Sequence, residues 1–208
     1  MTSAPLERTD HKAAFAAAFP RFLVDDVLVV ASTMPPHRLA PARPFPVVVA
    51  GERVAIPERV YNDELDGALT ASFSARQQTL FHCLYSRHHD GRVRQRHVEQ
   101  IVALAEPWVV PFVVRLVGEY VVEIHRVIWD GLVDIDIPGA AQHDVYGAFL
   151  AANPAFLQRT RQQVASYWAC YYRNRWPRKY YPGTVIVESL RDAARHSAAG
   201  RGGPTAVR

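Results

Sequence analysis

Aromatic and basic side chains alternate in one stretch of the chain, and together they are suited to binding anions. Residues 166–183 contain seven aromatic and four basic side chains and no acidic one. Aromatic rings stack on nucleic-acid bases while arginine and lysine neutralise phosphates, so the stretch suits single-stranded nucleic acid, nucleotides or another anionic ligand. The residues predicted to bind it are Tyr172, Arg173, Arg175, Trp176, Arg178, Lys179 and Tyr180.

The same residue types have two other interpretations. Trp168, Tyr171 and Tyr172 have a helical spacing, which is typical of core residues whose outer faces carry stacked arginines. Tyrosine and arginine are also enriched at the energetically dominant positions of protein–protein interfaces. The sequence therefore leaves open whether the partner is a polyanion or a protein.

A second group of potentially reactive side chains falls between residues 82 and 97. Its members are His82, Cys83, His88, His89, Asp90 and His97. Imidazole and thiolate are zinc ligands, but no two of these histidines are three or four residues apart, as helical zinc motifs require. We therefore assign no metal ligand and predict no cofactor.

Paired carboxylates form a third candidate, in the apolar stretch 108–132. Glu119 and Glu123 are one helical turn apart, a spacing that suits acid/base work but also ion pairs with Arg115 and Arg126. The alternative to a binding module is thus an enzyme with a site between residues 82–97 and a helix over 108–132. Its catalytic candidates are His88, His89, Asp90 and Glu119.

The apolar stretch 108–132 also suggests a third class of function. A helix this apolar could need a partner chain for its burial, which indicates a structural subunit of a larger assembly. A membrane span is not expected, because five charged side chains interrupt the stretch. The oligomeric state is not predicted by these patterns.

Charge is distributed unevenly along the chain. Residues 1–158 hold 14 basic and 18 acidic side chains, whereas residues 159–208 hold 10 basic and 2 acidic ones, so their net charges are −4 and +8. Such asymmetry indicates an anionic partner at the basic end. Because 22 of the 24 basic residues are arginine, which GC-rich coding also produces, the arginine count alone establishes no function.

Cysteine usage and the N-terminal residues predict a cytoplasmic location. Cys83 and Cys170 are far apart and flanked by apolar or aromatic residues, which favours reduced thiols in the core. No basic leader followed by an apolar run opens the chain. The common phosphate-loop, dinucleotide-binding and hydrolase-elbow motifs are not found either.

The N-terminal elements that accompany these residues are short. The patterns predict a helix over residues 10–19 that ends at Pro20, and a strand over residues 22–31 because of its β-branched side chains. A proline-rich connector follows over residues 34–46. Residues 45–49 and 53–56 then flank a glycine-containing turn, which is typical of a hairpin.

Helical periodicity dominates from residue 70 onward. Helices are predicted over residues 70–87, 93–104, 107–132, 142–152 and 154–175. The residues Asp90-Gly91-Arg92-Val93-Arg94, with Asp90 as helix cap, resemble a local signature of HEAT-type helical repeats, in which Asp, Val and Arg open the second helix of a pair. The resemblance implies stacked helix pairs and no specific function.

Together these patterns predict a mainly α fold, with a helical domain and a small N-terminal β hairpin. Residues 1–57 would form the N-terminal helix, the β element and the connector, residues 58–196 the helical domain, and residues 197–208 a disordered tail. We expect a non-enzymatic binding or scaffold module whose basic, aromatic C-terminal surface contacts a protein or a polyanion.

Overall fold

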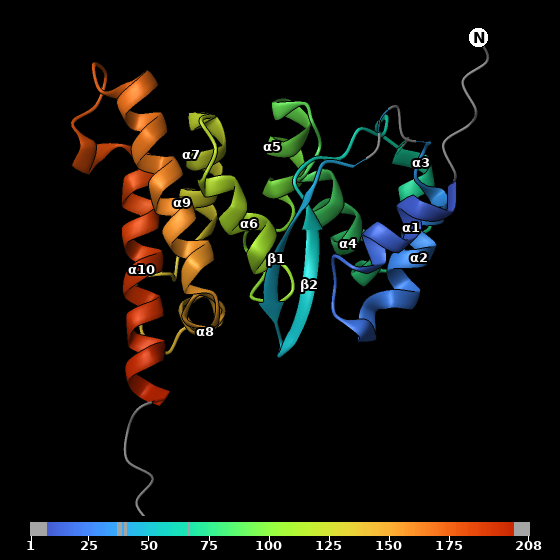
Figure 1. Cartoon of the computed structure of the whole chain (residues 1–208), viewed down its shortest axis with the longest axis horizontal. Helices are drawn as coiled ribbons and strands as arrows, with labels where there is room; N and C mark the ends of the chain where they lie inside the picture. The colour runs from blue at the N-terminus through green and yellow to red at the C-terminus, as the bar shows by residue number, and fades with distance from the viewer. Residues whose placement is uncertain (1–7, 37–38, 40, 66, 202–208) are drawn as a thin grey trace, which may run out of the picture. The chain divides into compact units, whose positions relative to one another are not determined.

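The structure, a computed structural model, describes residues 8–36, 39, 41–65 and 67–201. The chain forms two compact units, Met1–His97 and Val98–Arg208. The predicted fold class is confirmed, since helices predominate and a small antiparallel hairpin lies in the first unit (Figure 1). The division between the units falls inside α5, and the predicted domain boundary after residue 57 stays a prediction.

The N-terminal unit contains short helices and the hairpin. Its elements are α1 (Arg8–Ala16), a 3-10 turn (Arg21–Leu23), α2 (Val24–Thr33), β1 (Pro44–Val49), β2 (Glu52–Pro57), α3 (Gly67–Thr70), α4 (Ala75–Tyr85) and α5 (Gly91–Glu99), which crosses into the second unit.

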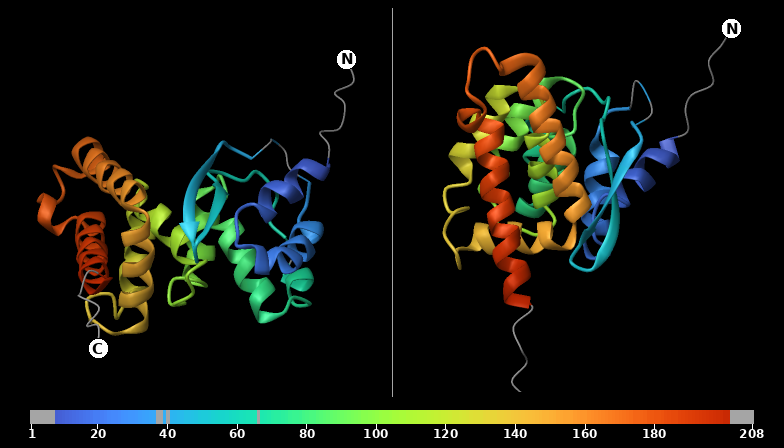
Figure 2. Two further views of the ribbon diagram at one scale, coloured as in Figure 1. Left: turned by 60° about the horizontal axis from the view of Figure 1, so that its bottom comes forward. Right: turned by 60° about the vertical axis from the view of Figure 1, so that its left-hand side comes forward.

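The hairpin confirms the prediction from its turn residues (Figure 2). Val49 pairs with Glu52, so that only Ala50 and Gly51 form the turn, with φ angles of 50° and 83°. Two positive φ angles define the turn type that matches the natural twist of paired strands. On β1, Phe45, Val47 and Val49 are buried and alternate with more exposed residues, so one face of the hairpin joins the core.

The strand predicted over residues 22–31 is wrong, because α2 occupies most of this segment. Val27, Val30 and Ala31 are buried at helical spacing, and Asp25 and Asp26 lie in the first turn, where the helix dipole favours acidic side chains. Packing of this apolar face outweighs the small helix-forming disadvantage of β-branched residues.

The C-terminal unit is built from longer helices. Its elements are α6 (Val110–Val117), α7 (Val122–Gly131), α8 (Ala141–Ala152), α9 (Pro154–Tyr167), a π-helical turn (Trp168–Tyr172), a 3-10 turn (Arg178–Tyr180) and α10 (Pro182–Arg201). Helices α8, α9 and α10 pack as neighbours, and the most extensive contact is between α8 and α10.

The single helix predicted over residues 107–132 is also wrong, since the chain breaks between α6 and α7. Gly118 ends α6 at a point where a Cβ atom would lie 2.6 Å from the Gln163 Oε1 atom. The Nε2–H group of the fully buried His125 donates to the Val117 carbonyl oxygen (3.0 Å), which α6 leaves unpaired at its end. The apolar residues of α6 are buried by the chain itself.

The disordered tail predicted from residue 197 is wrong for its first residues, because α10 continues to Arg201. Residues 202–208 lie outside the described part of the chain. Both cysteines are thiols as predicted, but only Cys83 is in the core, whereas Cys170 is exposed. No helix among the described residues is long and apolar enough to cross a membrane.

Candidate functional site

The aromatic and basic stretch lies where α9 ends and turns back toward α10 (Figure 1). The last turn of α9 passes into the π-helical turn Trp168–Tyr172, which leads through a loop into the 3-10 turn Arg178–Tyr180. A π-helical turn holds more residues than an α-helical one and is frequent at functional sites. Its five residues, Trp168 to Tyr172, include no buried one.

A cluster of packed rings holds this connection in place. Tyr172 stacks on Tyr181 with ring centres 5.1 Å apart, and Trp176 lies against both rings, at 5.5 Å from Tyr172 and 6.1 Å from Tyr181. The indole N–H of Trp168 donates to the Trp176 carbonyl oxygen (2.9 Å). Tyr181 is fully buried and the other three rings are half-buried, so these rings have a structural role.

The hydroxyl of Tyr172 links this cluster of packed rings to the connection between α6 and α7. It donates to the Tyr120 carbonyl oxygen at 2.6 Å. Desolvation raises the pKa of Tyr172, and the neighbouring Glu123 carboxylate raises it further, so the hydroxyl keeps its proton at neutral pH. Burial raises the pKa of Tyr181 as well. Neither ring carries charge in the physiological range.

Three other tyrosines of this region are open to solvent. The exposed fractions are 66% for Tyr171, 61% for Tyr180 and 53% for Tyr120. The ring centres of Tyr120 and Tyr171 are 5.9 Å apart, which adds a ring from the α6–α7 connection to those of the π-helical turn. Large exposed rings next to one another offer flat apolar area for stacking.

Four cations lie in the same connection between α9 and α10. The guanidinium of Arg175 lies 4.4 Å from the ring centre of Trp176, that of Arg178 lies 5.9 Å from Trp168, and the Lys179 ammonium lies 4.7 Å from Tyr180. Within the described part of the chain, neither these three cations nor the exposed Arg173 forms an ion pair with a carboxylate. Their charge is therefore available to an anion.

We call this set of exposed residues the basic-aromatic surface. It consists of Tyr120, Tyr171, Arg173, Arg175, Arg178, Lys179 and Tyr180. Of the seven residues predicted to bind, Tyr172 and Trp176 are half-buried and belong instead to the cluster of packed rings. Sequence reasoning did not select Tyr120 or Tyr171; Tyr120 is distant in the chain, whereas Tyr171 lies within the aromatic stretch itself.

The turn at residues 88–90 serves the structure of the N-terminal unit. The buried His88 donates from Nε2 to the Asn62 carbonyl oxygen (2.8 Å), and its Nδ1 accepts from the Asp90 N–H (3.1 Å), so both ring nitrogens are in use. His89 is exposed and stacks on Tyr61 at 5.5 Å. Asp90 accepts from the Arg92 N–H (2.8 Å), as the predicted cap requires.

The residues of the HEAT-like signature also have local roles in this unit. Arg94 is 3% exposed, and its Nη1 donates to the His88 carbonyl oxygen (2.9 Å) and to the His89 carbonyl oxygen (2.8 Å). Val93 is buried in the core. Arg94 thus ties α5 to the turn that follows α4, Asp90 caps α5, and Val93 joins the core.

His82 and His97 form a contact that the sequence did not predict. Their Nδ1 atoms are 2.9 Å apart, so one neutral ring donates to the other. Burial lowers the pKa of His97 to about 3, and His82 and Arg96 add to the shift. The Glu64 carboxylate, 3.7 Å from Nε2 of His97, therefore faces a neutral imidazole at neutral pH.

The catalytic candidates are divided between the two units. His88, His89 and Asp90 belong to the first, whereas Glu119 is buried in the second. In the part of the chain that the structure describes, no group of three or more His, Cys, Asp and Glu side chains is arranged to hold a metal ion.

Comparisons of the chain with protein-family models, curated proteins and solved structures give no match. The candidate function therefore depends on the local chemistry of the basic-aromatic surface, its exposed rings and its cations.

Proposed function

We propose that the protein is a non-enzymatic binding module that takes single-stranded nucleic acid on its basic-aromatic surface. One observation carries the proposal: the connection between α9 and α10 holds four exposed cations without a carboxylate partner in the described residues and two exposed tyrosine rings, and the third exposed ring, Tyr120, lies 5.9 Å from Tyr171. Phosphates need the cations, and unpaired bases need the rings.

The arrangement favours a single strand over a duplex. In a duplex the base faces are stacked on one another, so only the phosphates would be recognised by Arg173, Arg175, Arg178 and Lys179. In a single strand the bases can turn out and stack on Tyr171 and Tyr180. We therefore expect tighter binding to single strands than to duplexes of the same length.

The alternative occupant of the basic-aromatic surface is a protein partner with an acidic surface. Such a partner would satisfy the cations but would not need unpaired bases. A cytoplasmic location fits either occupant, because Cys83 and Cys170 are thiols and reducing compartments keep thiols unoxidised.

The test is a fluorescence-anisotropy titration of the full chain with labelled single-stranded DNA and RNA at low salt. In the variant Arg173→Glu/Arg175→Glu/Arg178→Glu, we expect affinity to fall by more than about tenfold, because three phosphate contacts become repulsive. The matched control is Arg53→Glu/Arg92→Glu/Arg159→Glu, which makes the same change in net charge at exposed arginines outside the surface.

Retained affinity in the control and lost affinity in the first variant support the proposal. Equal losses in both variants would mean that only net charge matters, and would contradict a defined site. Absence of binding to any single strand at low salt would overturn the nucleic-acid function and leave an acidic protein as the partner.

A further inference from the structure

Helices α8 and α10 approach closely because a glycine lies between them. A Cβ atom on Gly147 would lie 2.5 Å from the Ala193 carbonyl oxygen and 3.3 Å from the Ser197 Cβ atom. No larger side chain fits there unless the helices separate. The contact brings His143, one turn before Gly147 on α8, close to His196, one turn after Ala193 on α10.

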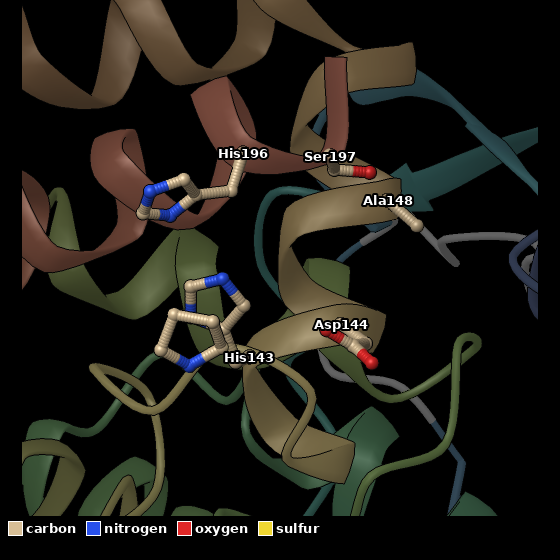
Figure 3. Close-up of a pocket in the computed structure, with 6 residues that line it drawn as sticks. His143, Asp144, Ala148, His196 and Ser197 are labelled. Atoms are coloured by element: carbon tan, nitrogen blue, oxygen red, sulfur yellow. The ribbon is translucent and has the colours of Figure 1, made fainter. Parts of the chain in front are cut away.

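A pocket of about 440 Å³ opens beside this contact (Figure 3). Its lining residues are Pro138, His143, Asp144, Ala148, His196 and Ser197. The two imidazoles lie next to each other in Figure 3, with ring centres 5.3 Å apart.

The hydrogen bond of His143 determines which of its two ring nitrogens keeps a lone pair. Its Nδ1 lies 2.8 Å from the Ile135 carbonyl oxygen. A carbonyl oxygen only accepts, so Nδ1 carries the proton and Nε2 is left as an acceptor. His143 is 4% exposed, and its Nε2 has no hydrogen-bond partner among the described residues.

A buried acceptor without a donor is costly unless a ligand or an ordered water satisfies it. We propose that His143 and His196 form a two-imidazole site for a divalent transition-metal ion of the zinc class. A backbone carbonyl that holds the other ring nitrogen is the usual way in which proteins orient a metal-binding histidine. Two imidazoles on one tetrahedral ion have ring centres about 5 Å apart, given metal–nitrogen bonds of about 2 Å.

The donor set narrows the class of ion. Imidazole suits Zn²⁺, Cu²⁺ and Ni²⁺, whereas Ca²⁺ and Mg²⁺ prefer oxygen ligands. Asp144 lies at the pocket, but its Oδ1 already accepts from the Gly139 N–H (3.2 Å) and it points away from the rings (Figure 3). Two protein ligands therefore leave the other positions of the ion open to water or to an anion.

The test is an isothermal titration of the full chain with Zn²⁺ at pH 7.5. We expect one site per chain, with an affinity at least about tenfold weaker in His196→Ala, because even the loss of an indirect partner of a metal ligand has this effect. His196 is exposed, so this variant should fold normally. His143→Gln should have the same effect and is checked by circular dichroism for folding.

His89→Ala is the matched control, since it removes an exposed histidine of the other unit and should leave the Zn²⁺ affinity unchanged. At pH 5 binding should be lost, because protons compete for imidazole lone pairs. Equal Zn²⁺ affinity in wild type and His196→Ala, or no Zn²⁺ binding at pH 7.5, would overturn the site. The nucleic-acid proposal is unaffected by either result.

Discussion

The histidine turn of the N-terminal unit and the basic-aromatic surface of the C-terminal unit are both rich in chemically active side chains, but they use them differently. Around the turn, His88 has partners for both ring nitrogens, and His82 and His97 are partners for each other. On the surface, Tyr171 and Arg173 point to solvent. Density of reactive residues in a sequence indicates a site only when their polar atoms remain unsatisfied after folding.

The two regions also differ in how they handle charge. Burial lowers the pKa of His82 and brings that of His97 to about 3, so these two imidazoles near the turn are uncharged at neutral pH. The surface contains arginine and lysine, which stay charged throughout that range. Changes to the turn should therefore affect stability, and changes to the surface should affect binding.

The largest loss of folding stability should come from His88→Ala. This change removes two hydrogen bonds and leaves a cavity, so we expect the free energy of unfolding to fall by about 2–4 kcal/mol. Tyr180→Ala, on the basic-aromatic surface, should change it by less than about 0.5 kcal/mol. Urea denaturation of both variants measures the difference. Similar losses would show that the surface is as structural as the turn.

Stability should fall as the solution is acidified below pH 6.5. The folded-state pKa of His97 is about 3 and that of His125 about 4, both lowered by burial, so the unfolded chain binds protons first. Each histidine then removes up to about 1.4 kcal/mol per pH unit until the pH reaches its folded pKa.

Urea midpoints between pH 7 and pH 4 measure this dependence, and His97→Asn should make it shallower. A stability that stays constant from pH 7 to pH 5 would contradict neutral, buried histidines. The charge of the basic-aromatic surface does not change in this interval, so binding by chains that remain folded should be nearly constant.

Local signals in the sequence predicted part of this fold. The hairpin was predictable because Ala50-Gly51-Glu52 places a glycine between two apolar strands, and the start of α5 because Asp90 caps it. The helix α2 was not, because its β-branched residues resemble a strand and only packing of Val27 and Val30 decides for a helix.

The site residues also differ in whether the sequence could predict them. The cations of the basic-aromatic surface were predictable because they are neighbours in the sequence. Tyr120 was not, because it joins Tyr171 only through the fold. The contact between His143 and His196 depends on the close approach that Gly147 allows, and no spacing rule indicates it.

A smaller effect should separate stacking from charge on the basic-aromatic surface. Tyr171→Ala and Tyr180→Ala should each weaken binding of single-stranded DNA by about 1 kcal/mol, or roughly fivefold, since each removes a stacking ring without changing charge. Tyr171→Phe should bind as wild type. Anisotropy titrations measure the series, and an effect of Tyr171→Phe equal to that of Tyr171→Ala would indicate that the hydroxyl and not the ring makes the contact.

The most direct test of the proposed function is the salt dependence of single-stranded DNA binding. If Arg173, Arg175, Arg178 and Lys179 each contact a phosphate, the logarithm of the binding constant should fall against the logarithm of salt concentration with a slope of about −3, and Arg175→Ala should reduce its magnitude by about 0.7. A wild-type slope near zero, or a slope that Arg175→Ala leaves unchanged, would contradict binding through these cations.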